Sequence, residues 1–336
     1  MSIVNNLSLK PYNSFNIDHK AQHFTVCNSI DNLKYILSET PPSTPILVLG
    51  GGSNILFTKD FTGLVIKNEI AGIEIIREDE QYYYIKAGSG VQWHDFVLYC
   101  IKNNYAGIEN LSLIPGTVGA SPIQNIGAYG VEIKDVFEEL TALNLETKEL
   151  LTFRHEECRF GYRDSIFKQE WKNKLFILDV TFRLNKVPVY RTSYGDIESY
   201  LKQMNVKEYS IKAISDAVIA IRSAKLPDPE VTGNAGSFFK NPVVDETIFN
   251  KVYLTNNTMP FYRQGVNYKI PAAWLIEQCG WKGKTIGNVG CHAKQPLVLI
   301  NLGNANGKDV LALSQEIIDS VNASFGIVLE REVNVL

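Results

Sequence analysis

One segment decides how the fold of this chain is interpreted: Ile114-Pro115-Gly116-Thr117-Val118-Gly119-Ala120-Ser121-Pro122-Ile123-Gln124-Asn125-Ile126-Gly127-Ala128-Tyr129-Gly130. Four glycines and two prolines alternate there with small, polar and apolar residues. A plain surface loop seldom carries so much apolar material, and a buried loop must satisfy its backbone polar groups. The pattern therefore leaves two interpretations open: a compact packed loop, or a loop whose backbone groups bind a diphosphate and a flavin ring.

A second glycine-rich segment, Gly50-Gly51-Gly52-Ser53-Asn54, follows the apolar run Ile46–Leu49. Successive glycines let backbone N–H groups approach a phosphate, because no Cβ intervenes. The segment lacks the Gly-x-Gly-x-x-Gly pattern of dinucleotide-binding βαβ units. Gly283-Lys284-Thr285 does not complete a phosphate-binding loop either, since Gln278 holds the required glycine position. Alone, a glycine triplet is more often a tight turn.

Composition restricts the class of protein. The 336 residues are 45% hydrophobic and 21% charged, with a formal net charge of −3. This mix is typical of globular chains, at two or three domains for this length. No basic block suggests a nucleic-acid or membrane surface, and the N-terminus lacks the pattern of a signal peptide.

The cysteines predict neither disulfides nor a metal site. Their number is odd and their spacing is wide: Cys27, Cys100, Cys158, Cys279 and Cys291. This usage fits a reducing cytoplasm. Cys279, Cys291 and His292 form no close ligand pair, so no metal is expected.

Hydrophobic periodicity predicts a mixed α+β architecture rather than a regular βαβ series. The segment Ser89–Gln92 has the form of a capping box before a helix, and Gly326 suits a helix C-terminus. The prolines of Lys225–Pro229 should end the preceding helix, and residues from Gly233 onward are expected to form a loop. The predicted helices are Val91–Asn104, Ile211–Arg222, Pro271–Cys279 and Asp309–Phe325, and the predicted strands are Ile46–Leu49, Ile55–Phe57, Tyr82–Lys86 and Phe176–Leu184.

Five motifs, in order along the chain, resemble those of UDP-N-acetylenolpyruvoylglucosamine reductases. They are Leu49–Asn54, Ile114–Gly119, Cys158-Arg159-Phe160-Gly161-Tyr162-Arg163-Asp164-Ser165, Gly233-Asn234-Ala235-Gly236-Ser237-Phe238-Phe239-Lys240-Asn241-Pro242 and Leu329–Val333. Each motif alone is moderately specific, and all five in order are highly specific.

The resemblance implies a two-subdomain FAD-binding fold of the vanillyl-alcohol-oxidase type plus a separate α+β substrate-binding domain. The expected division is residues 1–67 for the first FAD-binding subdomain, 68–224 for the second and 225–325 for the substrate domain. Residues 326–336 are expected to return to the first subdomain. A monomer is expected, although no motif determines the oligomeric state.

The resemblance also implies the cofactor and its binding residues. Ser53 stands where several related oxidases carry a histidine bonded to the flavin, so the FAD should be non-covalent. NADPH is the expected co-substrate. The implied FAD-binding residues are Gly50, Gly51, Gly52, Ser53, Asn54, Ile114, Pro115, Gly116, Thr117, Gly119, Ala120, Ser121, Gln124, Asn125, Gly127 and Ala128.

Three residues match the family's catalytic positions. Arg163 would stabilise the charge that develops on the substrate carboxylate, since a guanidinium is always charged and binds carboxylates in fork geometry. Ser237 would donate a proton to an enolate-like carbon. Glu332 would hydrogen-bond the carboxylate, provided that burial raises its pKa. Each residue has a competing interpretation. Arg163 could form a structural ion pair with Asp164, and Ser237 could cap a helix or close a turn. Glu330, two residues from Glu332, could take the role assigned to Glu332.

Seven further residues are implied to bind UDP-N-acetylglucosamine enolpyruvate: Tyr129, Tyr162, Tyr194, Arg222, Lys225, Asn241 and Gln295. The stretch Ser193–Asp196 resembles the family type with a tyrosine-bearing loop, so Tyr194 would close over the nucleotide sugar. For Lys225 the alternative is a solvated surface charge, and for Tyr129 a half-buried tyrosine.

Two other functions are weighed. A flavin oxidase of a sugar or alcohol is disfavoured because no histidine follows Gly52. A non-enzymatic flavin or nucleotide-sugar binding protein is disfavoured because Arg163, Ser237 and Glu332 are all present.

Overall fold

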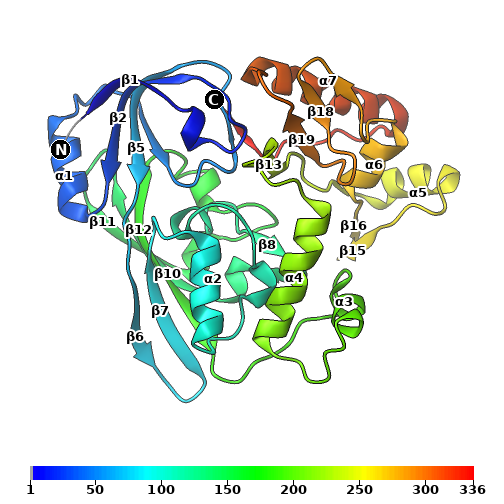
Figure 1. The fold of residues 1–336 in the computed structure, drawn as a ribbon, viewed down its shortest axis with the longest axis horizontal. Helices are drawn as coiled ribbons and strands as arrows, with labels where there is room; N and C mark the ends of the chain where they lie inside the picture. Colours follow the sequence, from blue (N-terminus) through cyan, green and yellow to red (C-terminus); the bar gives the residue numbers. More distant parts are fainter. Residues whose placement is uncertain (1–2) are drawn as a thin grey trace. The chain divides into compact units, whose positions relative to one another are not determined.

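The computed structural model describes residues 3–336, and the chain divides into two compact units (Figure 1). The first unit comprises the N-terminal residues up to Leu7, Ala21–Gly51 and Phe61–Ala224. The second comprises Ser8–Lys20, Gly52–Asp60 and Lys225–Leu336. The chain passes from one unit to the other between Gly51 and Gly52, inside the glycine triplet. The predicted division into three domains stays a prediction.

A four-stranded sheet begins the first unit, in the order β1 (Val4–Ser8), β2 (Lys20–Cys27), β5 (Phe61–Asn68) and β3 (Ile46–Leu49). β5 pairs in parallel with both β2 and β3. The helix α1 (Ile30–Glu39) begins at Ser29, whose hydroxyl accepts the N–H of Asn32 as an N-cap. Leu33, Ile36 and Leu37 are the buried face of α1.

A five-stranded antiparallel sheet forms the larger part of this unit. Its order is β11 (Leu150–Arg154), β10 (Phe137–Asn144), β12 (Leu175–Asn185), β7 (Tyr82–Gly88) and β6 (Ile73–Glu78). Phe182 of β12 packs against Trp93 and Phe96 of the helix α2 (Trp93–Lys102), with ring centroids 5.7 Å and 4.9 Å apart. This aromatic contact holds the start of α2 against the sheet.

The capping-box prediction at Ser89 is wrong. The helix begins two residues later than predicted, with Gln92 as N-cap and no side-chain cap. The Ser89 hydroxyl instead accepts a hydrogen bond of 2.7 Å from the amide of Asn68, which is buried in the core. The Ser89 side chain thus makes a tertiary hydrogen bond instead of the helix cap that the local pattern predicts.

Two helices complete the first unit, α3 (Ile197–Gln203) and α4 (Ile211–Lys225). The predicted stripe of α4 is buried, and the helix continues to Lys225, two residues before Pro227. A short hairpin of β8 (Gly127–Ala128) and β9 (Val131–Glu132) lies in the segment that follows α2.

The second unit joins helices to short sheets around one core. Its helices are α5 (Glu246–Thr255), α6 (Ala272–Gln278) and α7 (Gly307–Phe325). Its strands are β13 (Gly233–Ser237), β19 (Val298–Asn301), β18 (Val289–Cys291) and β17 (Thr285–Ile286) in one sheet, β14 (Val243–Val244), β16 (Asn267–Lys269) and β15 (Tyr262–Gln264) in another, and β20 (Asn334–Val335) with β4 (Ile55–Leu56) in a third. The predicted end of α7 is confirmed, since Gly326 is left-handed with φ 68°.

The loop predicted from Gly233 onward is wrong, because residues 233–237 form β13 and pair with β19. Glycine, asparagine and alanine have little intrinsic preference for strands, so backbone pairing with a distant segment decides this element.

All five cysteines are free thiols. Within residues 3–336, no group of three or more histidine, cysteine or acidic side chains could hold a metal ion. Over the same residues, no helix is long and apolar enough to cross a bilayer.

Candidate functional site

The two glycine-rich segments meet in the first unit. A Cβ on Gly51 would lie 2.8 Å from the Cα of Gly116, and a Cβ on Gly50 would lie 2.7 Å from the hydroxyl of Thr117. Only glycine permits this approach of backbone to backbone. Backbone groups presented without side chains form a cradle that suits a diphosphate, so the residues present fit FAD.

The start of α2 holds the second glycine segment in place through the backbone. Trp93 N–H donates to the carbonyl of Gly116 at 2.9 Å, and the N–H of Gly119 donates to the carbonyl of Ser89 at 2.9 Å. A Cβ on Gly119 would lie 2.5 Å from the Cβ of Ser89. The segment is therefore packed against a rigid helix terminus rather than free in solvent.

Leu113 turns the chain into this segment with an unusual left-handed φ of 59°. Its N–H donates to Nδ1 of His94 at 3.0 Å, and its carbonyl accepts from Nε of Arg222 at 3.3 Å. A left-handed leucine is strained and persists only where its surroundings hold it. Burial, together with the charge of Arg222, lowers the pKa of His94, which favours the neutral ring that accepts the Leu113 N–H.

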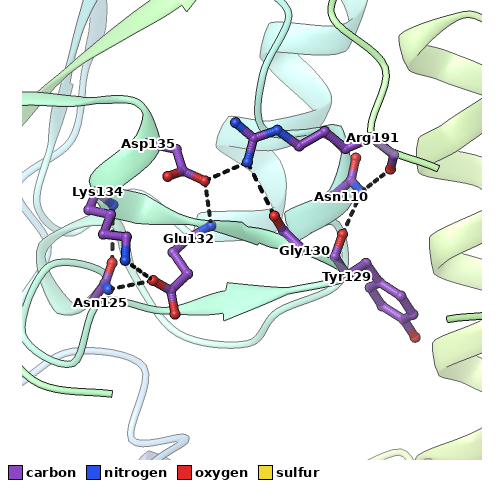
Figure 2. Close-up of polar contacts among 8 residues, drawn as sticks. All are labelled: Asn110, Asn125, Tyr129, Gly130, Glu132, Lys134, Asp135 and Arg191. Atoms are coloured by element: carbon purple, nitrogen blue, oxygen red, sulfur yellow. Dashed lines mark hydrogen bonds and ion pairs between the residues drawn. The ribbon is translucent and has the colours of Figure 1, made fainter. Parts of the chain in front are cut away.

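Asn125 uses its side chain to hold the loop. The residue is fully buried and left-handed, with φ 46°. Its Nδ2 donates to Glu132 and its Oδ1 accepts the N–H of Lys134 (Figure 2). The same Nδ2 also donates to the carbonyl of Gly161. Asn125 thereby joins the glycine-rich segment to the turn that carries Arg163.

The third glycine of the triplet and the residues that follow it lie in the second unit. Gly52 has φ 63°, and a Cβ there would lie 1.9 Å from the carbonyl oxygen of Tyr12. Asn54 donates from Nδ2 to the carbonyl of Glu332 at 3.3 Å. The predicted cofactor residues from Gly50 to Asn54 are thus divided between two units, which the sequence does not reveal.

Arg163 lies in a tight turn of the first unit with φ 54°. Its Nη2 donates to the carbonyl of Gly127 at 2.6 Å, and its guanidinium lies 5.4 Å from the centre of the Tyr162 ring. Asp164 accepts from the Ser165 N–H and from the Gln169 amide. Asp164 therefore has hydrogen-bond donors of its own, and the Arg163 guanidinium contacts the glycine-rich segment at Gly127.

The charge of Arg163 acts on Arg222, which is buried. Burial lowers the pKa of Arg222, the positive charge of Arg163 lowers it further, and Tyr129 opposes the shift. Two neighbouring guanidiniums in a desolvated site favour an anionic ligand, which would relieve this repulsion.

The β8–β9 hairpin places Tyr129 at its tip. Tyr129 and Gly130 both have positive φ, 48° and 80°, as a two-residue type I′ turn requires. Tyr194 and Gly195 pack against this turn: a Cβ on Gly130 would lie 3.3 Å from the Cβ of Tyr194, and a Cβ on Gly195 would lie 3.4 Å from the Tyr129 ring. The two predicted substrate tyrosines are therefore neighbours.

Ser237 ends β13 in the second unit, directly after a bulge. The register with β19 shifts between Asn234 and Ser237, and Gly236 between them has φ 67°. A bulge re-aims the side chain that follows it. The Ser237 hydroxyl makes no hydrogen bond to any residue from 3 to 336 and caps no helix, in contrast to the structural interpretation of this serine.

The segment that carries Glu332 runs antiparallel to residues 238–240. Glu332 N–H donates to the carbonyl of Phe238 at 2.8 Å, next to Ser237. Glu330 instead pairs its carboxylate with the ammonium of Lys240 and is largely exposed. The backbone thus brings Glu332 beside Ser237, and the competing candidate Glu330 has an ordinary surface partner.

Two other predicted residues of the second unit lie on segments adjoining Ser237. Asn241 accepts the N–H of Ala272 at the start of α6 through Oδ1. Gln295 precedes β19 and accepts from the Leu297 N–H, while Leu297 accepts from Phe238. Lys225 ends α4 and is largely exposed, so its role as a phosphate ligand remains a prediction.

Sequence reasoning missed Lys67, a residue of β5. Its ammonium donates to the carbonyl of Gly50 at 2.9 Å, and burial lowers its pKa. A half-buried ammonium beside a phosphate-type cradle is a candidate ligand for the diphosphate. A charged residue directly after the apolar run Leu64–Ile66 was the available signal.

The fold and this backbone cradle define a flavoprotein. A family model for an FAD binding domain matches residues 21–153, and one for the C-terminal domain of UDP-N-acetylenolpyruvoylglucosamine reductase matches residues 228–336. Curated reductases of that name are 49% identical in Flavobacterium johnsoniae and 50% in Amoebophilus asiaticus, each over 100% of both chains. The chain belongs to the UDP-N-acetylenolpyruvoylglucosamine reductase family and is an FAD-dependent oxidoreductase.

Solved structures agree on the fold. The UDP-N-acetylenolpyruvylglucosamine reductase of Thermus caldophilus matches with a TM-score of 0.67 at 22% identity, covering 100% of this chain and 99% of that one. p-Cresol methylhydroxylase matches with a TM-score of 0.50 at 13% identity, covering 97% and 85%. The predicted flavoprotein fold of the vanillyl-alcohol-oxidase type is thus confirmed.

Proposed function

We propose that this protein catalyses the NADPH-dependent reduction of UDP-N-acetylglucosamine enolpyruvate to UDP-N-acetylmuramate, a step of peptidoglycan precursor synthesis in the cytoplasm. When bound by the glycine-rich segments, FAD would supply the hydride transfer from NADPH to the enol ether. The single observation that carries the proposal is the placement of Ser237 after a glycine bulge, beside the segment of Glu332.

Arg163 stabilises the substrate carboxylate as negative charge develops on it. The left-handed turn and the bond to the Gly127 carbonyl hold the guanidinium before substrate arrives. Electrostatic stabilisation that is organised in advance commonly contributes more to catalysis than any other effect. The nearby charge of Arg222 strengthens the local preference for an anion.

Ser237 donates the proton. Its hydroxyl has no acceptor among residues 3–336 that would compete for this proton. The acceptor is an enolate-like carbon of high basicity, so a weakly acidic hydroxyl suffices. Glu332 binds the carboxylate through a shared proton, and its main-chain bonds to Phe238 and Asn54 hold it in place.

We expect the nucleotide sugar to be bound by the seven predicted residues Tyr129, Tyr162, Tyr194, Arg222, Lys225, Asn241 and Gln295. Tyr194 covers the ligand, and Lys225 contacts its phosphates. NADPH occupies the same site before the sugar substrate does.

Anaerobic visible spectra test the proposal. The purified protein should be yellow, bleach with NADPH and regain its colour when UDP-N-acetylglucosamine enolpyruvate is added. Colour that returns only with oxygen would contradict the reductase function and support an oxidase. A colourless protein that cannot be reconstituted with FAD would contradict both.

A further inference from the structure

One buried side chain joins the two loops that carry the substrate tyrosines. Asn110 lies in the 3₁₀ turn Glu109–Leu111 and is 1% exposed. Its Nδ2 donates to the carbonyl of Tyr129 at 2.9 Å and to the carbonyl of Arg191 at 2.7 Å. One amide group thus bridges the hairpin tip and the loop that leads to Tyr194 (Figure 2).

Arg191 makes a second bridge between the same segments. Its Nη1 donates to the carbonyl of Gly130 at 3.2 Å and to Oδ2 of Asp135 at 2.9 Å. The same Asp135 oxygen accepts the N–H of Glu132 at 3.2 Å. Figure 2 shows the Tyr129 ring pointing away from this polar network, while both carbonyls of the turn point into it.

The two bridges differ in strength. The side chains of Arg191 and Asp135 are 52% and 27% exposed, and exposed ion pairs contribute little. Asn110 is buried, so its removal would leave two backbone carbonyl groups without the donor that they share. Asn110 is therefore the main anchor, and the ion pair is the lesser one.

We propose that Asn110 is a positioning residue that holds the Tyr194 loop docked on the Tyr129–Gly130 turn before substrate binds. This proposal rests on the proposed function, in which Tyr194 covers the nucleotide sugar. The reciprocal packing of Tyr194 on Gly130 and of Tyr129 on Gly195 persists only while the two backbones stay at this separation. A loop ordered in advance lowers the cost of ordering it on binding and so lowers KM.

The test uses the FAD-loaded enzyme and Asn110→Leu, which keeps the size of the side chain and removes both donors. Leucine is preferred to aspartate because the neighbouring Glu109 is buried, and burial already raises its pKa. Limited trypsin cleavage after Arg191 is measured without substrate, since Asn110 binds the carbonyl of that very peptide bond. Cleavage after Lys172, in an exposed turn, is the internal reference.

Cleavage follows the undocked population, which rises about tenfold when the docked population falls from about nine-tenths to about a tenth. We therefore expect cleavage after Arg191, relative to Lys172, to be about tenfold faster in Asn110→Leu. KM for UDP-N-acetylglucosamine enolpyruvate should rise about tenfold, with kcat within about twofold. Asp135→Asn removes the exposed ion pair and keeps an oxygen that can accept the N–H of Glu132, so it should change cleavage by less than about fivefold. Asn256→Leu removes two amide hydrogen bonds at the end of α5 and should change neither quantity.

An unchanged cleavage ratio in Asn110→Leu would overturn the proposal, and so would faster cleavage with an unchanged KM. If the leucine variant does not fold, Asn110→Ser, whose side chain is too short to reach both carbonyls, is measured in the same way. Wild-type protein that does not reduce the enolpyruvyl substrate would refute the proposed function instead. The cleavage ratio needs no substrate, so the two failures are distinguishable.

Discussion

The close approach of the glycine segments predicts the effect of a single methyl group. In Gly51→Ala the new Cβ would lie 2.8 Å from the Cα of Gly116, whereas ordinary contacts begin at 3.4 Å. The obstacle is backbone rather than a flexible side-chain end, so the segments must separate by about 0.6 Å, the difference between these two distances. Overpacking of this kind costs about 1–3 kcal/mol.

If FAD is bound between the two segments, this cost weakens cofactor binding. A penalty of about 1–3 kcal/mol corresponds to an FAD dissociation constant about 5–150 times larger. The assay is titration of apoprotein with FAD, followed by flavin fluorescence, together with urea unfolding of the apoprotein. The control is Gly161→Ala, where the nearest contact of the new Cβ is a permissible 3.5 Å from the Cβ of Asp164.

Two results would refute this reasoning. Equal FAD affinities of Gly51→Ala and wild type, with a lower free energy of unfolding for the variant, would show that the cradle is only structural. Equal affinities and equal unfolding free energies would show that the segments separate at no cost.

Three further predictions concern proton transfer, charge and pH. In Ser237→Ala, the rate of flavin reduction by NADPH should stay within about twofold of wild type. The rate of reoxidation by the enolpyruvyl substrate should fall about 10²–10⁴-fold, as for loss of a general acid. Rapid-mixing spectra that show equal slowing of both half-reactions would remove Ser237 from the donor role. In Lys67→Met, FAD affinity should fall about 10–100-fold and depend less on salt, because a charge-assisted bond to the diphosphate is lost. FAD titrations at low and high ionic strength measure both effects. A salt dependence equal to that of wild type would contradict this prediction. The folded-state pKa of His94 is lowered, so below about pH 6.5 the unfolded chain binds a proton more readily than the folded protein. The free energy of unfolding should therefore decrease on acidification from about pH 6.5, by at most about 1.4 kcal/mol per pH unit from this group. Urea unfolding should show a smaller decrease in His94→Gln, while His292, whose pKa burial also lowers, contributes equally to both proteins.

Local periodicity predicted the elements whose burial depends on their own sequence. The stripe Ile211, Ile214, Val218 and Ile221 is the buried face of α4, and Gly326 ends α7 as expected. Each of these predictions uses neighbours one helical turn apart, which the chain holds together whatever the rest of the fold does. The motifs around Arg163 and Ser237 were likewise visible as runs of residues, and so was the cofactor class.

The tertiary structure alone decided which distant segments meet. The sequence does not show that Gly51 lies against Gly116, that Asn68 hydrogen-bonds the hydroxyl of Ser89, or that residues 233–237 pair with β19 as a strand. It also does not show that Asn110 joins Tyr129 to Arg191. These contacts depend on backbone groups far apart along the chain, and a backbone carbonyl or N–H has the same chemistry at nearly every residue. Local patterns therefore carry the identity of the reacting groups, whereas long-range hydrogen bonding determines how they are held.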